Sequence, residues 1–141
     1  ANGIFSISMW VNLLTQIDAF PSIIDKSNVG DWTNAAATCK GFIVLKHNSN
    51  YEFEMSNGSG ANFDTISLGA HAIFENAGWK NIIISVSATE IISYVDNVFI
   101  ATTTRTSKSL GNIDVVDKLN IGRWRWLNRN INGSICKVRL Y

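Results

Sequence analysis

The chain has 141 residues, a length that suits one domain with a single hydrophobic core. Hydrophobic residues make up 46% and charged residues 16%, and the formal net charge of +1 gives no overall field that would steer the protein toward nucleic acid or an anionic membrane. No apolar stretch approaches the roughly 18 to 20 residues that span a bilayer, so we expect no membrane insertion. Neutral partners are favoured, and any electrostatic recognition must come from a local cluster.

Short β-strands are predicted throughout the chain. In residues 5–13, apolar and polar side chains alternate with the period of two expected of a strand that has one face on a core. Asp96 and Asn97 connect two apolar runs and tolerate the positive φ angles of a tight hairpin turn. The same reasoning predicts further strands at 22–26, 41–47, 51–55, 66–68, 81–87, 91–95, 98–103, 118–121 and 133–141. About ten short strands without a long helical period predict an all-β sandwich or barrel.

The two cysteines, Cys39 and Cys136, lie far apart and lack metal-ligand spacing. Cys136 alternates in phase with Val138 and Leu140, so we expect its side chain to face the core. A buried free thiol and a disulfide to Cys39 both fit this pattern, and a core of this size needs no bridge to fold.

The acidic and histidine residues do not form a recognisable catalytic group. Glycoside hydrolases need two carboxylates across a cleft, and Glu52 and Glu54 project from one strand face two residues apart. A solvated strand face explains this pair better than catalysis does. His47 and His71 have neither a second ligand nearby nor a Ser or Cys partner at a recognisable spacing, so we interpret both as surface or structural histidines. We therefore predict that the protein is not an enzyme.

Metal binding rests on scattered acids, among them Asp25, Asp31, Asp114 and Asp117. Calcium takes roughly six to eight oxygen ligands, and no loop of this chain reaches the density of carboxylates that such a site needs. One calcium ion, completed by backbone carbonyls of the loop at 27–40, stays an open alternative. No other cofactor is expected.

Several stretches, read in order, resemble the laminin-G-like jelly-roll family of the concanavalin-A-like lectin/glucanase superfamily. They are FSISMWV at 5–11, WKNIII at 79–84, YVDNV at 94–98, LNIG at 119–122 and the closing segment 131–141. The resemblance covers nearly the whole chain. It implies that residues 1–141 form one antiparallel β-sandwich domain with the concanavalin-A-like jelly-roll topology.

The resemblance also implies roles for particular residues. Trp10 and Trp79 match family positions that are structural, so we expect both indoles to pack. Lys137 stands where the family often carries an acid, and a role that depends on that acid does not carry over. Family members usually have one or two strands before the strand that begins here at Phe5. We therefore expect an exposed sheet edge near this strand, or an edge filled by another chain or segment.

The remaining tryptophans lie in predicted loops. Two alternate along the loop at 123–130 and would present their indoles on one side of an extended segment, with arginines on the other. Sugar rings stack their C–H faces on indole, and their hydroxyls need planar hydrogen-bond partners such as Asn and Arg. A structural role as a lid over the sandwich end is the alternative for these tryptophans. The predicted carbohydrate-binding residues are Trp32, Arg123, Trp124, Arg125, Trp126 and Asn128.

Family members bind glycans, other proteins or sulfated polysaccharides, some with calcium, and they rarely do chemistry, so the fold alone does not decide the function. We predict a non-catalytic, lectin-like module of a larger secreted or surface protein, with a glycan or glycoprotein as its partner. The alternative is a structural or adhesive protein-binding domain of a viral or cell-surface assembly. Nucleic acid fits less well, because the arginines of the loop have no wider basic surface around them.

Overall fold

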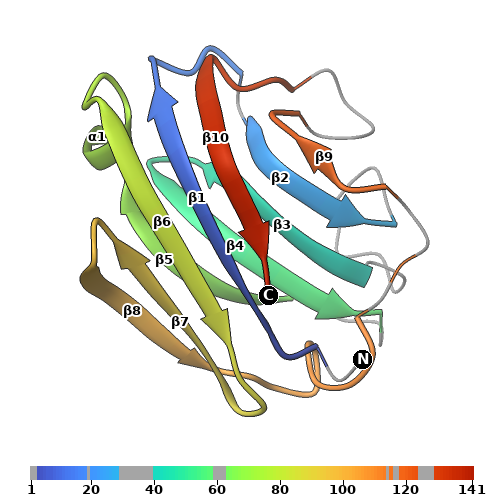
Figure 1. The fold of residues 1–141 in the computed structure, drawn as a ribbon. Helices are drawn as coiled ribbons and strands as arrows, with labels where there is room; N and C mark the ends of the chain where they lie inside the picture. Colours follow the sequence, from blue (N-terminus) through green and yellow to red (C-terminus); the bar gives the residue numbers. More distant parts are fainter. Residues whose placement is uncertain are drawn as a thin grey trace.

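The computed structural model describes residues 3–18, 20–28, 40–58, 63–113, 115, 118–123 and 129–141. Within these residues the elements are β1 (Phe5–Leu13), β2 (Ser22–Ser27), β3 (Lys40–His47), β4 (Asn50–Asn57), β5 (Asp64–Ala70), α1 (His71–Phe74), β6 (Trp79–Val86), β7 (Glu90–Val95), β8 (Val98–Thr104), β9 (Asn120–Ile121) and β10 (Gly133–Leu140). They form two antiparallel sheets that pack face to face (Figure 1). The front sheet has the order β10-β1-β6-β7-β8 and the back sheet the order β5-β4-β3-β2-β9.

The apolar side chains that alternate along the strands point inward and form the core between the two sheets. In β1, Ile7, Met9 and Val11 are fully buried while the intervening side chains face outward. Asp96 and Asn97 have φ angles of 51° and 65°, which confirms the predicted tight hairpin between β7 and β8. The antiparallel sandwich predicted from the strand pattern is therefore confirmed. Among the described residues, no helix is long and apolar enough to cross a membrane.

The edge of the front sheet lies next to β1. This strand pairs with β10 on one side and with β6 on the other, so β10 rather than β1 forms the edge.

A bulge interrupts the pairing of β10 with β1. Ser8 faces Arg139 and Trp10 faces Cys136, so β10 carries one residue more than β1 over this stretch. Lys137 adopts a φ of 51°, the left-handed conformation in which a strand accommodates such an extra residue.

The bulge explains why the predicted burial of Cys136 is wrong. The extra residue changes the phase of the strand, so Ile135 and Val138 pack toward the core and Cys136 is an exposed free thiol. The bulge breaks the predicted alternation through Cys136, Val138 and Leu140. Nothing in the sequence alone indicated a bulge at this point. Cys39, the other candidate for a bridge, lies outside the described residues.

A carboxylate near the end of the sandwich joins β3, β4 and α1. The side chain of Glu75 is 6% exposed, and it accepts hydrogen bonds from Lys46 Nζ at 2.6 Å and from the Tyr51 hydroxyl at 3.3 Å. His71 Nδ1 lies 3.6 Å from the second carboxylate oxygen. Burial raises the pKa of Glu75, but the hydrogen bond and charge of Lys46 outweigh burial, and the pKa lies below its ordinary value of 4.5. Burial, reinforced by the charge of Glu75, raises the pKa of Tyr51.

We expect Glu75→Gln to lower the free energy of unfolding at neutral pH by about 2 kcal/mol, because Lys46 loses a charge-assisted acceptor. The pKa of Glu75 is lower in the folded state, so this stabilisation is present above pH 4.5 and is lost as the pH falls through the folded pKa. Urea denaturation across this range should show the two proteins converging in stability at low pH. Glu90→Gln, which removes an exposed carboxylate, is the control. A difference that does not depend on pH would contradict this account.

Candidate functional site

Two tryptophans lie together on the outer face of the front sheet. Trp10 belongs to the polar, outward phase of β1 and pairs with Asn81 of β6, while Trp79 pairs with Asn12. The two indoles are therefore diagonal neighbours on one face. Trp10 is 37% exposed and Trp79 is 46% exposed. The prediction that both tryptophans pack as structural residues is wrong, because the pleat directs them to solvent and not into the core.

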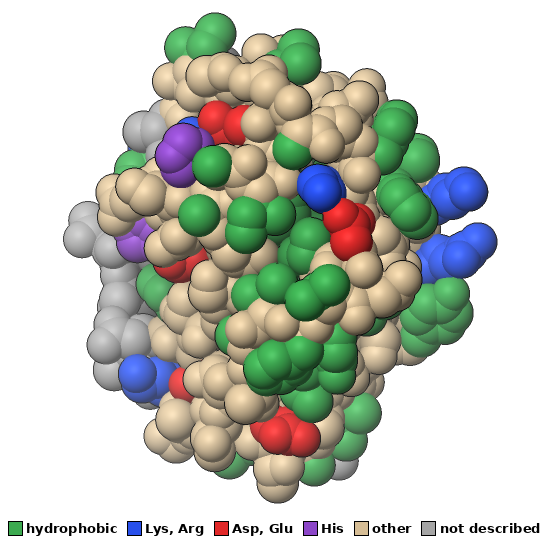
Figure 2. Space-filling view, turned by 90° about the vertical axis from the view of Figure 1, so that its left-hand side faces the viewer, with side chains coloured by type: hydrophobic (Ala, Val, Ile, Leu, Met, Phe, Trp, Pro, Cys, Tyr) green, Lys and Arg blue, Asp and Glu red, His purple; other side chains and the backbone are tan. Residues whose placement is uncertain are grey.

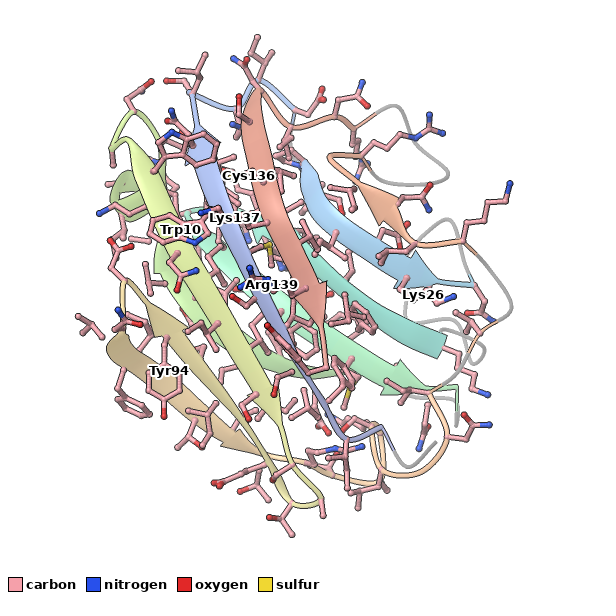
Figure 3. The ribbon with its side chains drawn as sticks, viewed as in Figure 1. Trp10, Lys26, Tyr94, Cys136, Lys137 and Arg139 are labelled. Atoms are coloured by element: carbon pink, nitrogen blue, oxygen red, sulfur yellow. The ribbon has the colours of Figure 1, made fainter. Side chains whose placement is uncertain are left out.

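The two indoles line a hollow with side chains of the bulge on β10. Its walls are Trp10, Trp79, Cys136 and Lys137, and its volume is about 280 Å³. Ligand pockets range from roughly 300 to 1,000 Å³, so this hollow is of a size for one small group. Figure 3 shows Trp10, Cys136, Lys137 and Arg139 on this sheet. The bulge directs both Cys136 and Lys137 to the face that carries the indoles.

Hydrogen bonds between β1, β6 and the β7–β8 turn hold the polar groups of this face in place. Asn81 is 8% exposed, and its Nδ2 donates to the carbonyl of Met9 at 3.1 Å. Asp96 accepts from the backbone N–H of Asn81 at 2.9 Å and from Lys80 Nζ at 2.9 Å. The hydrogen bond from Asn81, followed by that from Lys80, lowers the pKa of Asp96. The Asp96 carboxylate is thus charged at neutral pH and offsets the charge of Lys80.

The aromatic surface extends across the sheet to its other edge. Tyr94 of β7 pairs with Phe99 of β8, and their ring centroids lie 6.0 Å apart with the rings edge to face. Val98 and Phe99 are 62% and 55% exposed. Figure 2, which views the molecule from the side on which β8 lies in Figure 1, shows hydrophobic side chains exposed there. The outer face of the front sheet therefore carries two apolar regions, one at the tryptophans and one at β8.

A second hollow, also of about 280 Å³, opens at the end of the sandwich between the sheets. Its walls are mainly apolar and include Phe5, Phe42 and Leu140. Lys26 is the charged residue in this lining, and its Nζ donates to the carbonyl of Val115 at 3.0 Å. This hollow offers few groups for the hydroxyls of a sugar, so we favour the tryptophan hollow as the candidate site.

The predicted site on the loop at 123–130 is described only in part. Arg123 is exposed and forms an isolated bridge with Asn130. The other predicted carbohydrate-binding residues, Trp32, Trp124, Arg125, Trp126 and Asn128, lie outside the described residues. The loop site therefore stays a prediction. So does the calcium alternative, since most of the loop at 27–40 is also outside them.

Two expectations for polar residues on the back sheet are wrong: that Glu54 lies on a solvated face, and that His47 has no second ligand nearby. Glu54 is not part of a solvated face, because it is 2% exposed. His47 is not remote from other ligands, because its Nδ1 lies 3.4 Å from Glu52 Oε2 and 3.9 Å from Glu54 Oε1. Ile43 and Leu45 are buried on the same face. Glu54 is thus buried and Glu52 is 19% exposed, so the two carboxylates do not form an open pair on the surface.

The two antiparallel sheets and their topology define a β-sandwich of the concanavalin A-like jelly-roll class. The chain belongs to the family Laminin_G_3, described as the concanavalin A-like lectin/glucanases superfamily, which matches residues 1–141. This confirms the resemblance seen in the sequence. No curated protein matches the chain.

Solved structures of similar fold include modules from carbohydrate-active proteins. The CBM40 of the Ruminococcus gnavus IT-sialidase, bound to α2,3-sialyllactose, has a TM-score of 0.73 at 18% identity, covering 100% of this chain and 77% of that one. Domain 4 of AbnA, an extracellular GH43 arabinanase from Geobacillus stearothermophilus, in complex with arabinotriose, has a TM-score of 0.61 at 14% identity, covering 98% and 60%. The botulinum neurotoxin serotype D binding domain has a TM-score of 0.69 at 12% identity, covering 99% and 34%. At these identities the likeness concerns the fold.

Proposed function

We propose that this domain is a non-catalytic carbohydrate-binding module whose glycan lies on the outer face of the front sheet, against Trp10 and Trp79. The observation that carries the proposal is the hollow in which two part-exposed indoles stand beside Lys137. An indole offers a flat apolar surface to the C–H face of a sugar, and the neighbouring ammonium group donates hydrogen bonds to its oxygens. The hollow has the size of a terminal sugar unit and not of a long chain.

Similar folds support the same class of ligand. The Ruminococcus gnavus module is bound to sialyllactose and the Geobacillus domain to arabinotriose. Both are parts of enzymes that act on glycans, and this agrees with our proposal that the present domain belongs to a larger secreted or surface protein. The loop residues Trp32, Trp124 and Trp126 remain a predicted second location for the glycan.

The charges at the hollow favour an acidic glycan over a neutral one. Lys137 and Arg139 are both exposed on β10: Lys137 lines the hollow, and Arg139 pairs with Ser8, two residues before Trp10 on β1. Asp96, in the turn between β7 and β8, is already paired with Lys80, the neighbour of Trp79 on β6, at 2.9 Å. A carboxylate-bearing sugar would gain charge-assisted hydrogen bonds from the β10 cations.

We expect Lys137→Ala and Arg139→Ala each to weaken the binding of a sialylated glycan several-fold at low salt, because each removes a charge beside the ligand. Added salt should weaken binding to the native protein by screening these charges, and it should weaken the two variants less. A glycan array probed at two salt concentrations, followed by titration calorimetry on the best ligand, measures both effects. Lys118→Ala, which removes an exposed cation elsewhere, should bind like the native protein. Binding of neutral glycans alone would contradict the acidic class, and binding of no glycan would contradict the proposed function.

A structural or adhesive role is the second candidate, and the exposed side chains at β8 favour it. Val98 and Phe99 lie on the edge strand of the front sheet, where a partner protein could cover them. The replacement Phe99→Ser separates the two functions. It should leave glycan binding intact and weaken only the association with a protein.

A further inference from the structure

A mixed group of nitrogen and oxygen ligands lies on the back sheet, away from the tryptophan hollow. It consists of His47, Glu52 and Glu54, and one potential ligand atom from each residue lies within 4.8 Å of the other two. The β3–β4 hairpin brings them together, because His47 pairs with Asn50 and Glu52 follows on the outer face of β4. Glu52 and Glu54 are two residues apart on one strand and so share that face.

The spacing of these atoms suits a metal ion. Ligands about 2.1 Å from a tetrahedral ion lie about 3.4 Å from one another. The distance from His47 Nδ1 to Glu52 Oε2 is 3.4 Å, and that to Glu54 Oε1 is 3.9 Å. The two distances from the imidazole are thus close to this value, and the three ligand atoms lie within 4.8 Å of one another.

The surroundings provide a rigid base and an open entrance. Glu54 is 2% exposed and lies among the buried Ile43 and Leu45, which restrict its side chain. The ring of Phe20 lies 5.3 Å from that of His47, centroid to centroid, and restricts the imidazole. The side chains of His47 and Glu52 are 38% and 19% exposed, so an ion can enter from solvent on their side.

We infer that His47, Glu52 and Glu54 form a binding site for a divalent transition-metal ion, with Zn²⁺ as its best occupant. One imidazole and two carboxylates are ligands that Zn²⁺ accepts, and water completes the coordination. Cu²⁺ binds nitrogen and oxygen ligands more tightly than Zn²⁺, but it prefers a square-planar or tetragonal arrangement, whereas Zn²⁺ accepts the tetrahedral spacing found here. Ca²⁺ and Mg²⁺ prefer oxygen ligands alone, and the imidazole disfavours them.

Zinc titration by calorimetry tests the site. The titration uses the Cys136→Ser variant, because an exposed thiol also binds Zn²⁺ and would add a second site. The protein, freed of metal with EDTA, should bind about one Zn²⁺ per chain and melt at a higher temperature with Zn²⁺, but not with Ca²⁺. His47→Ala and Glu52→Gln should each weaken Zn²⁺ binding by about 100-fold, as loss of a direct ligand must cost at least as much as loss of a supporting group.

His71→Ala is the matched control. His71 pairs with a single carboxylate, that of Glu75, so its loss should leave the affinity for Zn²⁺ unchanged. Glu52→Gln alters a part-exposed side chain and should keep the fold, and circular dichroism checks this. Co²⁺ added in place of Zn²⁺ should give visible d–d absorption that His47→Ala removes. The site would be disproved by absence of Zn²⁺ binding, by equal binding in His47→Ala, or by binding of Ca²⁺ in its place.

Discussion

Arg105→Ala is expected to lower the free energy of unfolding by about 3 to 5 kcal/mol, the range for losing one partner of a buried charged group. Arg105 is 4% exposed, and its guanidinium donates to the carbonyls of Gly3 at 3.1 Å, Ser87 at 2.6 Å and Ser109. These contacts tie the start of β1 and the β6–β7 turn to the loop after β8. Burial lowers the pKa of Arg105, and the charge of Asp64 opposes this effect. The residue stays charged, so its removal leaves several buried acceptors without donors.

Asp64 completes the same network from β5. Its carboxylate accepts from the backbone N–H and the hydroxyl of Thr106, both at 2.7 Å, and from the hydroxyl of Ser109. Because Arg105 and Asp64 share Ser109, the effects of Arg105→Ala and Asp64→Asn should be non-additive in a double-mutant cycle. Urea denaturation measures the four stabilities, and Lys118→Ala should change stability by less than about 0.5 kcal/mol. A loss below about 1 kcal/mol for Arg105→Ala would show that water replaces its hydrogen bonds.

Trp10→Ala and Trp79→Ala should each weaken glycan binding by about tenfold, and the double replacement should weaken it more than either one. Stacking on an aromatic ring contributes on the order of 1 kcal/mol or more, and about 1.4 kcal/mol corresponds to a factor of ten. Calorimetric titration with the best array ligand measures these losses. Trp10→Phe keeps a ring on the face and should lose less.

Thermal melting of the same variants shows whether the replacements change the stability of the fold. Both indoles are more than a third exposed, so the fold should survive their removal with a modest fall in Tm. Val98→Ala truncates another exposed apolar side chain of the front sheet and should bind the glycan normally. If both tryptophan variants keep the fold and the affinity for the glycan, the front sheet is not the binding site.

The sandwich could be predicted because burial and strand period agree along most of the chain. The alternation at 5–13 and the turn at Asp96 and Asn97 are local signals, and both features form as expected. The bulge at Lys137 was not predictable in this way, since it depends on how β10 meets β1. The strand expected at 118–121 shortens to Asn120–Ile121.

The candidate sites were harder to predict than the fold. The position of Trp10 among Ser6, Ser8 and Asn12 did carry a signal, because these residues define an outward face. The resemblance to the family implied that Trp10 packs as a structural residue, whereas the pleat of β1 directs its side chain to solvent. In the group around His47, the spacing of Glu52 and Glu54 was visible in the sequence, but only the register of the hairpin brings His47 to them.

The location of the glycan is tested most directly by NMR on the indole N–H groups of the five tryptophans. With ¹⁵N-labelled protein, replacement of each tryptophan in turn assigns the signals, and sialyllactose is then titrated. The front-sheet account predicts that the signals of Trp10 and Trp79 shift together and saturate with one dissociation constant, while Trp124 and Trp126 do not respond. Shifts confined to Trp32, Trp124 and Trp126 would place the ligand on the loops instead, and the absence of any shift with every array ligand would contradict carbohydrate binding.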